Sequence, residues 1–342
     1  MKHLFITASA FLISIAAIAQ EASLLKLDVE ARVDYMQEYQ DRAKINDASG
    51  FKGRYLNIRM DGTLAENVSY SYRQRLNKPS KDATFFDATD WITLNYQSGN
   101  WTFSGGKQVV GIGGFEYDGA PIDLYFCSEY WNNIACYQYG VSLAWDTASR
   151  NDRLMFQFCE SPFRRNVLNI ENEEMFAYNV MWVGSHGIYS SLYSLNFIEY
   201  LPGRFINYLV LGNRFTSGDF QLDLDFMNRA VNLKDFGKDF SVMCELKWFP
   251  INSLDIFAKA TYDRNIAEEE GDWCVTPGTA VTRIGAGIEF YPIKDSKALR
   301  LHLNCCYTYG KVAETAVLQN KQTIIDAGLT WKMNMLNLKR RP

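Results

Sequence analysis

Apolar and polar side chains alternate with a period of two along most of the chain. The run from Leu25 to Tyr35 is the clearest case, because its odd positions are apolar and its even positions are charged. Successive side chains of a β-strand point to opposite faces, so this run has one apolar and one ionisable face. The same alternation recurs at 137–145, 176–182, 220–226, 240–248 and 299–303, among other segments. It predicts strands and excludes an amphipathic helical protein.

Segments of about eight to fourteen residues give roughly sixteen strands, joined by connections that alternate between short and long. The expected short connections are 61–65, 98–100, 146–152, 184–187 and 250–253, and the expected long ones include 40–52, 77–90, 107–133, 164–173, 228–238 and 264–280. A tight link at Pro202 and Gly203 stands where a long loop is due. Short turns at one end and long loops at the other predict a transmembrane antiparallel β-barrel, with both termini on the periplasmic side.

Tryptophan placement favours the same fold class. Five of the eight tryptophans fall at the expected short-turn end, where amphipathic rings span hydrocarbon and headgroup: Trp101, Trp145, Trp182, Trp248 and Trp331. A soluble sandwich also alternates, but its strands are usually shorter and it gives no reason for such a rim.

The N-terminus indicates export. Lys2 followed by an apolar run to Ile18 and a small-residue site predicts a signal peptide over 1–19, leaving 20–342 as one outer-membrane β-barrel domain. The net charge of -4 argues against a nucleic-acid partner.

A barrel of this size is too wide for side chains to fill, so an aqueous channel is expected, with the polar strand faces as its wall. The expected wall residues are Lys26, Asp28, Glu30, Arg32, Arg59, Arg73, Arg75, Asp223, Asp225, Lys247, Arg283 and Arg300. Bases and acids nearly balance, so the wall predicts no strong charge selectivity, and each member is more readily a partner of its neighbour than a solute ligand.

The long connection 107–133 is the candidate constriction, because it is too apolar and glycine-rich for a solvated tip. Folded into the lumen, it would pack Val109, Ile112, Phe115 and Phe126 on the wall. The expected constriction residues are Lys107, Gln108, Glu116, Asp118, Asp123 and Glu129. Their acidic balance favours cations or neutral solutes, with at most a weak anion preference. An external cap or a partner-binding loop is the alternative.

The run ATDWITLNYQSGNWTFSGGKQVVGIGGFEYDG resembles the phosphate-selective porin family of outer membranes, at Gly106, Lys107, Gln108, Gly114 and Glu116. IIDAGLTWKMN at 324–334 is similar to the family's last strand. The resemblance implies an inward-folding third loop and a homotrimer.

Two departures from the family pattern bear on function. The loop has acids and no arginine, whereas guanidinium suits phosphate, so strong phosphate selectivity is not expected. The chain also continues past Trp331 to MLNLKRRP. Either the assembly signal differs or the last strand runs further.

Catalysis, metal and cofactors have little support in the sequence. Beyond the expected signal only His186 and His302 occur, so there is no histidine cluster for a metal, and we expect neither an enzyme nor a cofactor. Seven cysteines show no CxxC spacing, and a disulfide between Cys127 and Cys136 stays open.

The sequence therefore predicts a passive porin for small hydrophilic solutes or ions, embedded in outer-membrane lipid. A non-conducting surface barrel for adhesion or assembly is one alternative. A barrel enzyme that uses His302 is another.

Overall fold

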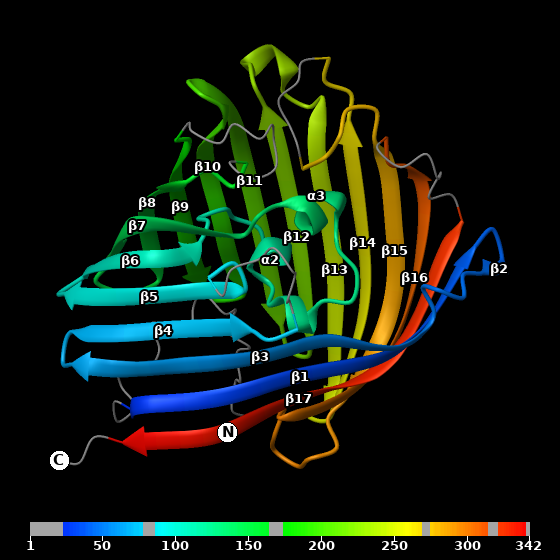
Figure 1. Cartoon of the computed structure of the whole chain (residues 1–342), viewed down its shortest axis with the longest axis horizontal. Helices are drawn as coiled ribbons and strands as arrows, with labels where there is room; N and C mark the ends of the chain where they lie inside the picture. Colours follow the sequence, from blue (N-terminus) through cyan, green and yellow to red (C-terminus); the bar gives the residue numbers. More distant parts are fainter. Residues whose placement is uncertain (1–22, 78–85, 164–173, 269–273, 314–320, 340–342) are drawn as a thin grey trace.

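The computed structural model describes residues 23–77, 86–163, 174–268, 274–313 and 321–339, so the expected signal peptide lies outside it. The described chain forms one antiparallel sheet that closes on itself (Figure 1). Sixteen long strands make the barrel, and β2 (Ala43–Lys44) is a two-residue addition beside β1. The predicted fold class is confirmed.

Each strand pairs with its neighbours in sequence, and β1 closes the barrel by pairing with both β3 and β17. At this closing seam Ala31 of β1 lies opposite Trp331 of β17. The strands are β1 (Ser23–Gln40), β3 (Gly50–Ala65), β4 (Val68–Arg75), β5 (Thr89–Ser98), β6 (Trp101–Val109), β7 (Tyr137–Asp146), β8 (Asp152–Glu160), β9 (Phe176–His186), β10 (Tyr189–Leu201), β11 (Arg204–Ser217), β12 (Phe220–Ala230), β13 (Asp239–Ile251), β14 (Leu254–Asn265), β15 (Ala280–Phe290), β16 (Leu299–Lys311) and β17 (Gln322–Lys339).

The barrel wall has an apolar outer face and a polar inner face. In β1, Val33 and Tyr35 are exposed on the outside, whereas Arg32 and Asp34, which alternate with them, are buried. This reverses the order of a soluble sandwich, in which the apolar face would be the core. Apolar side chains facing outward are what a strand needs in lipid, where a charge at mid-depth costs about 2–4 kcal/mol.

The ends of the strands agree with the expected asymmetry of connections, although several boundaries shift by a few residues. The first short turn lies at 66–67 rather than 61–65, because β3 and β4 stay paired down to Ala65 and Val68. The tight link at Pro202 and Gly203 is present, and Gly203 adopts a φ of 69° that favours glycine. The five predicted rim tryptophans are all exposed.

The last strand runs further than the family-like segment at 324–334. β17 continues past Trp331 to Lys339, which pairs with Ser23 of β1. Of the two explanations for the C-terminal extension, a longer last strand is therefore the correct one. The closing seam is built from two eighteen-residue strands, β1 and β17.

Candidate functional site: the loop inside the barrel

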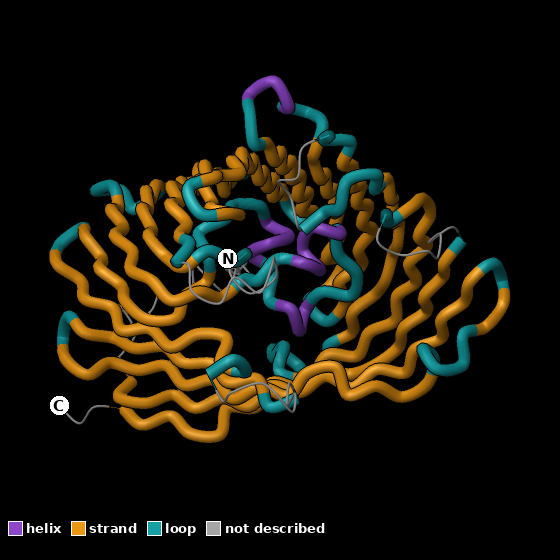
Figure 2. Tube along the Cα trace, turned by 45° about the horizontal axis from the view of Figure 1, so that its top comes forward, coloured by secondary structure: helices purple, strands orange, loops and turns teal. Residues whose placement is uncertain are grey.

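The connection between β6 and β7, residues 110–136, folds into the barrel and is called the inner loop below (Figure 2). It carries the short helix α2 (Phe115–Asp118), the 3-10 turn η2 (Pro121–Asp123) and the helix α3 (Glu129–Asn133). The Ser128 side chain caps α3 by accepting from the Trp131 N–H. The predicted inward fold is confirmed, and the reading of this segment as an external cap is wrong.

Two glycines let the inner loop enter against the wall. The N–H of Gly113 donates to Ser194 Oγ at 2.9 Å, and that of Gly114 donates to the Leu192 carbonyl at 3.1 Å. Gly114 has a φ of 93°, in the region that favours glycine. A Cβ added at Gly212 of β11 would lie 2.8 Å from the Gly114 Cα. Backbone therefore meets backbone here, with no room for a side chain.

Gly212→Val is expected to push the inner loop off the wall, at a cost of about 1–3 kcal/mol in unfolding free energy. Gly105→Val is the matched control, because a Cβ there meets nothing within 4 Å. Chymotrypsin is a suitable probe, since residues 110–136 contain aromatic residues but no Lys or Arg. The Gly212 variant should be cleaved in the loop while the Gly105 variant resists. Equal cleavage of the two variants would contradict the contact.

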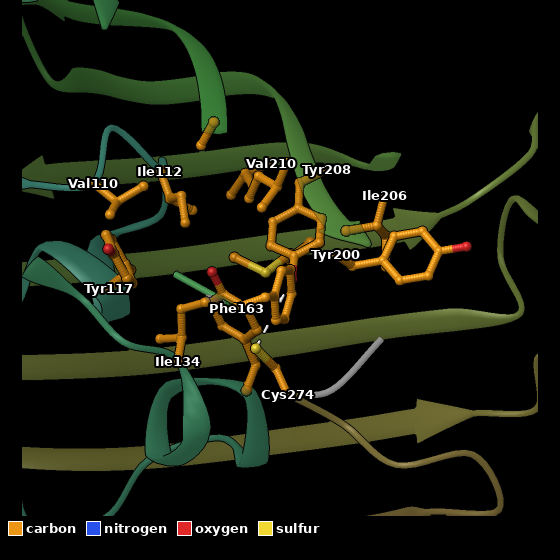
Figure 3. Packing of buried hydrophobic residues seen from close by; sticks show 14 of the residues in the cluster. Val110, Ile112, Tyr117, Ile134, Phe163, Tyr200, Ile206, Tyr208, Val210 and Cys274 are labelled. Carbon is orange, nitrogen blue, oxygen red and sulfur yellow. Dashed lines mark hydrogen bonds between the residues drawn. The ribbon is translucent and has the colours of Figure 1, made fainter. Parts of the chain in front are cut away.

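An apolar cluster binds the inner loop to β10 and β11 (Figure 3). Its fully buried members include Val110 and Ile112 from the loop and Ile198, Tyr200, Ile206, Tyr208 and Val210 from the wall. Ile112 thus packs on the wall as predicted, and Phe115 joins a second buried cluster with Met155, Met181 and Leu192.

Glu116, in α2, is turned toward the wall. Its Oε1 lies 2.7 Å from Lys259 Nζ of β14, and it accepts a hydrogen bond from the N–H of Ser128 at 3.0 Å. Lys259 Nζ also donates to the Phe126 carbonyl at 3.0 Å. Both charged side chains are buried, so the pair joins two segments of the loop to one strand.

Asp123 and Glu129 of the loop meet wall bases in the same way. Asp123 pairs with Arg300 at 2.9 Å and with Lys332 at 3.0 Å. Burial raises the pKa of the Asp123 carboxyl, but Lys332 and Arg300 outweigh it and hold the pKa well below its usual range. Glu129 pairs with Arg283 at 2.6 Å. The acidic balance of the loop therefore faces basic side chains of the wall.

Lys107 and Gln108 point to opposite sides of β6. Lys107 lies opposite Ile92 and Tyr139, which are exposed on the outer face, and its Nζ donates to the Phe86 carbonyl. Because β6 runs to Val109, Lys107 is a strand residue and not a member of the loop. Gln108 lies on the inner side, where its Oε1 accepts from Ser142 Oγ and its Nε2 donates to the Gly140 carbonyl.

Among the predicted wall residues, charged neighbours form pairs. Lys26 pairs with Asp28 and Arg59 pairs with Asp61, and all four side chains are partly exposed. Arg300 also reaches Glu289, Lys247 pairs with Glu245, and Asp223 pairs with Arg214. Asp225 accepts the N–H of Glu116 at 2.7 Å.

Trp91 is a lumen-side residue that the sequence analysis did not select. It lies opposite Arg73, and the Cζ atoms of Arg59 and Arg73 lie 5.8 and 5.0 Å from its ring centre. Asp90 pairs with both Arg73 and Arg75. The signal was present in the sequence, because Ile92 and Leu94 occupy the apolar face and leave Trp91 on the polar one.

Comparison with known proteins agrees with this architecture. The family described as phosphate-selective porin O and P matches residues 25–185. The predicted resemblance to this porin family is confirmed. No curated protein sequence gives a significant match. The match and the fold support an outer-membrane channel rather than an enzyme.

Solved porin structures share the fold at low sequence identity. An anion-selective porin from Comamonas acidovorans superposes with a TM-score of 0.63 at 12% identity, covering 91% of this chain and 100% of that one. OmpT of Vibrio cholerae, in a trimer form, gives 0.60 at 12% identity, covering 91% and 100%. The channel DcaP of Acinetobacter baumannii gives 0.59 at 10% identity, covering 90% and 96%.

All seven cysteines are free, so Cys127 and Cys136 form no disulfide. No helix within the described residues is long and apolar enough to cross a membrane.

Proposed function

We propose that this porin lets small hydrophilic solutes and ions diffuse passively across the outer membrane, without strong selectivity for phosphate. The observation that supports this most is the pairing of the inner-loop acids Glu116, Asp123 and Glu129 with bases of the wall. A loop neutralised in this way narrows the lumen while adding little net charge. Passage then depends mainly on solute size and on the mixed charges of the remaining wall.

The partly exposed wall supports the same reading. Lys26 lies 2.8 Å from Asp28, and Arg59 lies 2.6 Å from Asp61. Each pair presents both signs to water, so neither should act as a strong filter. Arg73 and Arg75 share the single acid Asp90, which leaves a small basic excess on β4. We therefore expect at most a weak anion preference.

A homotrimer embedded in outer-membrane lipid is part of the proposal. It rests on the family match and on the trimer form in which OmpT of Vibrio cholerae is described. Light scattering of the detergent complex, corrected for bound detergent, measures the protein mass per particle. Three chains per particle support the trimer, and one chain per particle contradicts it.

Planar-bilayer recording tests the channel itself. In a potassium chloride gradient, the reversal potential should correspond to an anion-to-cation permeability ratio below about three. Adding phosphate at constant chloride should leave the chloride current unchanged, because no phosphate-binding step is expected. Protein that inserts without conductance steps would overturn the proposal, and a strong block by phosphate would overturn its selectivity.

A further inference from the structure

Three chemically reactive side chains meet behind the inner loop at the closing seam of the barrel. They are Asp34 of β1, His302 of β16 and Asp326 of β17, and one ligand atom from each lies within 4.8 Å of the other two. His302 Nε2 is 3.3 Å from Asp34 Oδ1 and 3.5 Å from Asp326 Oδ1. The side chains of Asp34 and His302 are fully buried, and that of Asp326 is 3% exposed.

Several polar atoms of this cluster have no hydrogen-bond partner within the described part of the chain. Neither ring nitrogen of His302 has a hydrogen-bond partner there, and the same holds for Asp326 Oδ1. Buried polar atoms in native proteins almost always have a partner, so the two such atoms that face each other, His302 Nε2 and Asp326 Oδ1, call for an explanation. Pairwise hydrogen bonds do not supply it, because 3.3 and 3.5 Å exceed the usual 2.7–3.2 Å range for N–H···O.

The two separations fit atoms bound to one shared metal ion better than atoms joined by a hydrogen bond. Nitrogen and oxygen ligands bind zinc at about 2.0–2.2 Å, so two ligand atoms at tetrahedral angles lie roughly 3.3–3.6 Å apart. Both measured separations fall in this range. One imidazole and two carboxylates make a set that suits zinc, and a fourth position remains for water.

The charges of the cluster also favour a cation. Arg32 contacts Asp34 at 2.8 Å and Asp326 at 3.1 Å, so one buried base faces two buried acids. Arg54 comes within 3.6 Å of Asp34 but is 39% exposed, and water screens its charge. Arg32 donates a hydrogen bond to Oδ2 of Asp326, and the other oxygen, Oδ1, faces His302. Fixing one carboxylate oxygen while the other binds metal is a common outer-shell arrangement.

The inner loop covers the cluster. The Tyr125 ring centre lies 4.7 Å from that of His302 and also 4.7 Å from Arg32 Cζ. Arg32 Nη1 donates to the Leu124 carbonyl at 2.6 Å, which ties the cover to the cluster. We propose that Asp34, His302 and Asp326 bind one divalent transition-metal ion, best matched by zinc, which links strands β1, β16 and β17 at the closing seam beneath the inner loop. Because the cluster is buried, the ion enters as the barrel and its loop assemble.

Refolding the full chain in detergent with zinc chloride, or with EDTA, tests this site. After removal of free metal, elemental analysis should find about one zinc per wild-type chain. His302→Ala and the isosteric Asp326→Asn should each lower retention at least about tenfold, because losing even an outer-shell partner of a ligand costs about 10–100-fold in affinity. His186→Ala is the control, because His186 is half-exposed beside Asp152 and should not change retention.

The melting temperature separates the site from a general defect in folding. Zinc should raise the melting temperature of wild type and of His186→Ala. It should leave the melting temperature of Asp326→Asn unchanged. The folding of this variant is checked by its heat-dependent gel mobility. Wild type that retains no more zinc than His302→Ala would overturn the proposal. The proposal would also be overturned if zinc left the wild-type melting temperature unchanged while pH shifted it, and if His302→Ala abolished that pH dependence. The cluster would then bind a proton and not a metal ion.

Discussion

Replacing Arg32 by methionine is expected to lower the free energy of unfolding by about 3–5 kcal/mol, the usual cost of removing one partner from a buried ion pair. Arg32 has no exposed side-chain surface and contacts both Asp34 and Asp326. Its guanidinium also donates to the carbonyls of Ile122 and Leu124 in the inner loop. The substitution therefore leaves two buried carboxylates without their base and removes two hydrogen bonds that hold the loop at the seam.

Urea unfolding in lipid vesicles, followed by tryptophan fluorescence, measures this loss. EDTA in every sample keeps bound metal from compensating the two carboxylates. Arg59→Met is the matched control, because Arg59 pairs with Asp61 on the same inner wall but both side chains are partly exposed. Its cost should be at most about 1 kcal/mol. Similar losses for the two variants would contradict the role given to burial.

The strands were predictable because period-two alternation reports directly which face of a strand meets lipid. Val33 and Tyr35 are exposed on the outside and Arg32 and Asp34 are buried inside, as their order in the sequence requires. The ends of strands were less predictable, since a polar residue fits a lumen-facing strand as well as a turn. Lys107 shows the consequence. β6 runs three residues further than expected, to Val109, and this makes Lys107 a strand residue on the outer face, although its charge had favoured the constriction.

The inward fold of residues 110–136 was also predictable, because Ile112 and Phe115 need an apolar surface that water does not provide. The partners of the loop acids were not. Glu116 meets Lys259 and Asp123 meets Arg300, pairs far apart in sequence that only closure of the barrel brings together. The acidic composition of the loop consequently indicated a cation filter, whereas the contacts show anchors. His302 appeared isolated for the same reason, since Asp34 lies at the other end of the chain.

Lys259→Met is expected to loosen the inner loop and raise single-channel conductance. Lys259 is buried, with its Nζ 2.7 Å from Glu116 Oε1 and 3.0 Å from the Phe126 carbonyl. Without this base, Glu116 becomes a buried carboxylate that lacks its cation, at a cost of about 3–5 kcal/mol. Moving α2 toward water relieves that cost. The predicted result is a larger and noisier conductance, measured in planar bilayers on single channels.

Glu116→Gln combined with Lys259→Met separates charge from packing. The double variant removes both charges, and replacing a whole buried ion pair is often close to neutral. Its conductance should therefore return toward that of wild type, with a coupling energy between the two sites of about 1–3 kcal/mol in unfolding. Lys247→Met serves as the control on the neighbouring strand, because Lys247 is one-third exposed and pairs with Glu245. A double variant as open as Lys259→Met would mean that shape, and not the ion pair, holds the loop in the lumen.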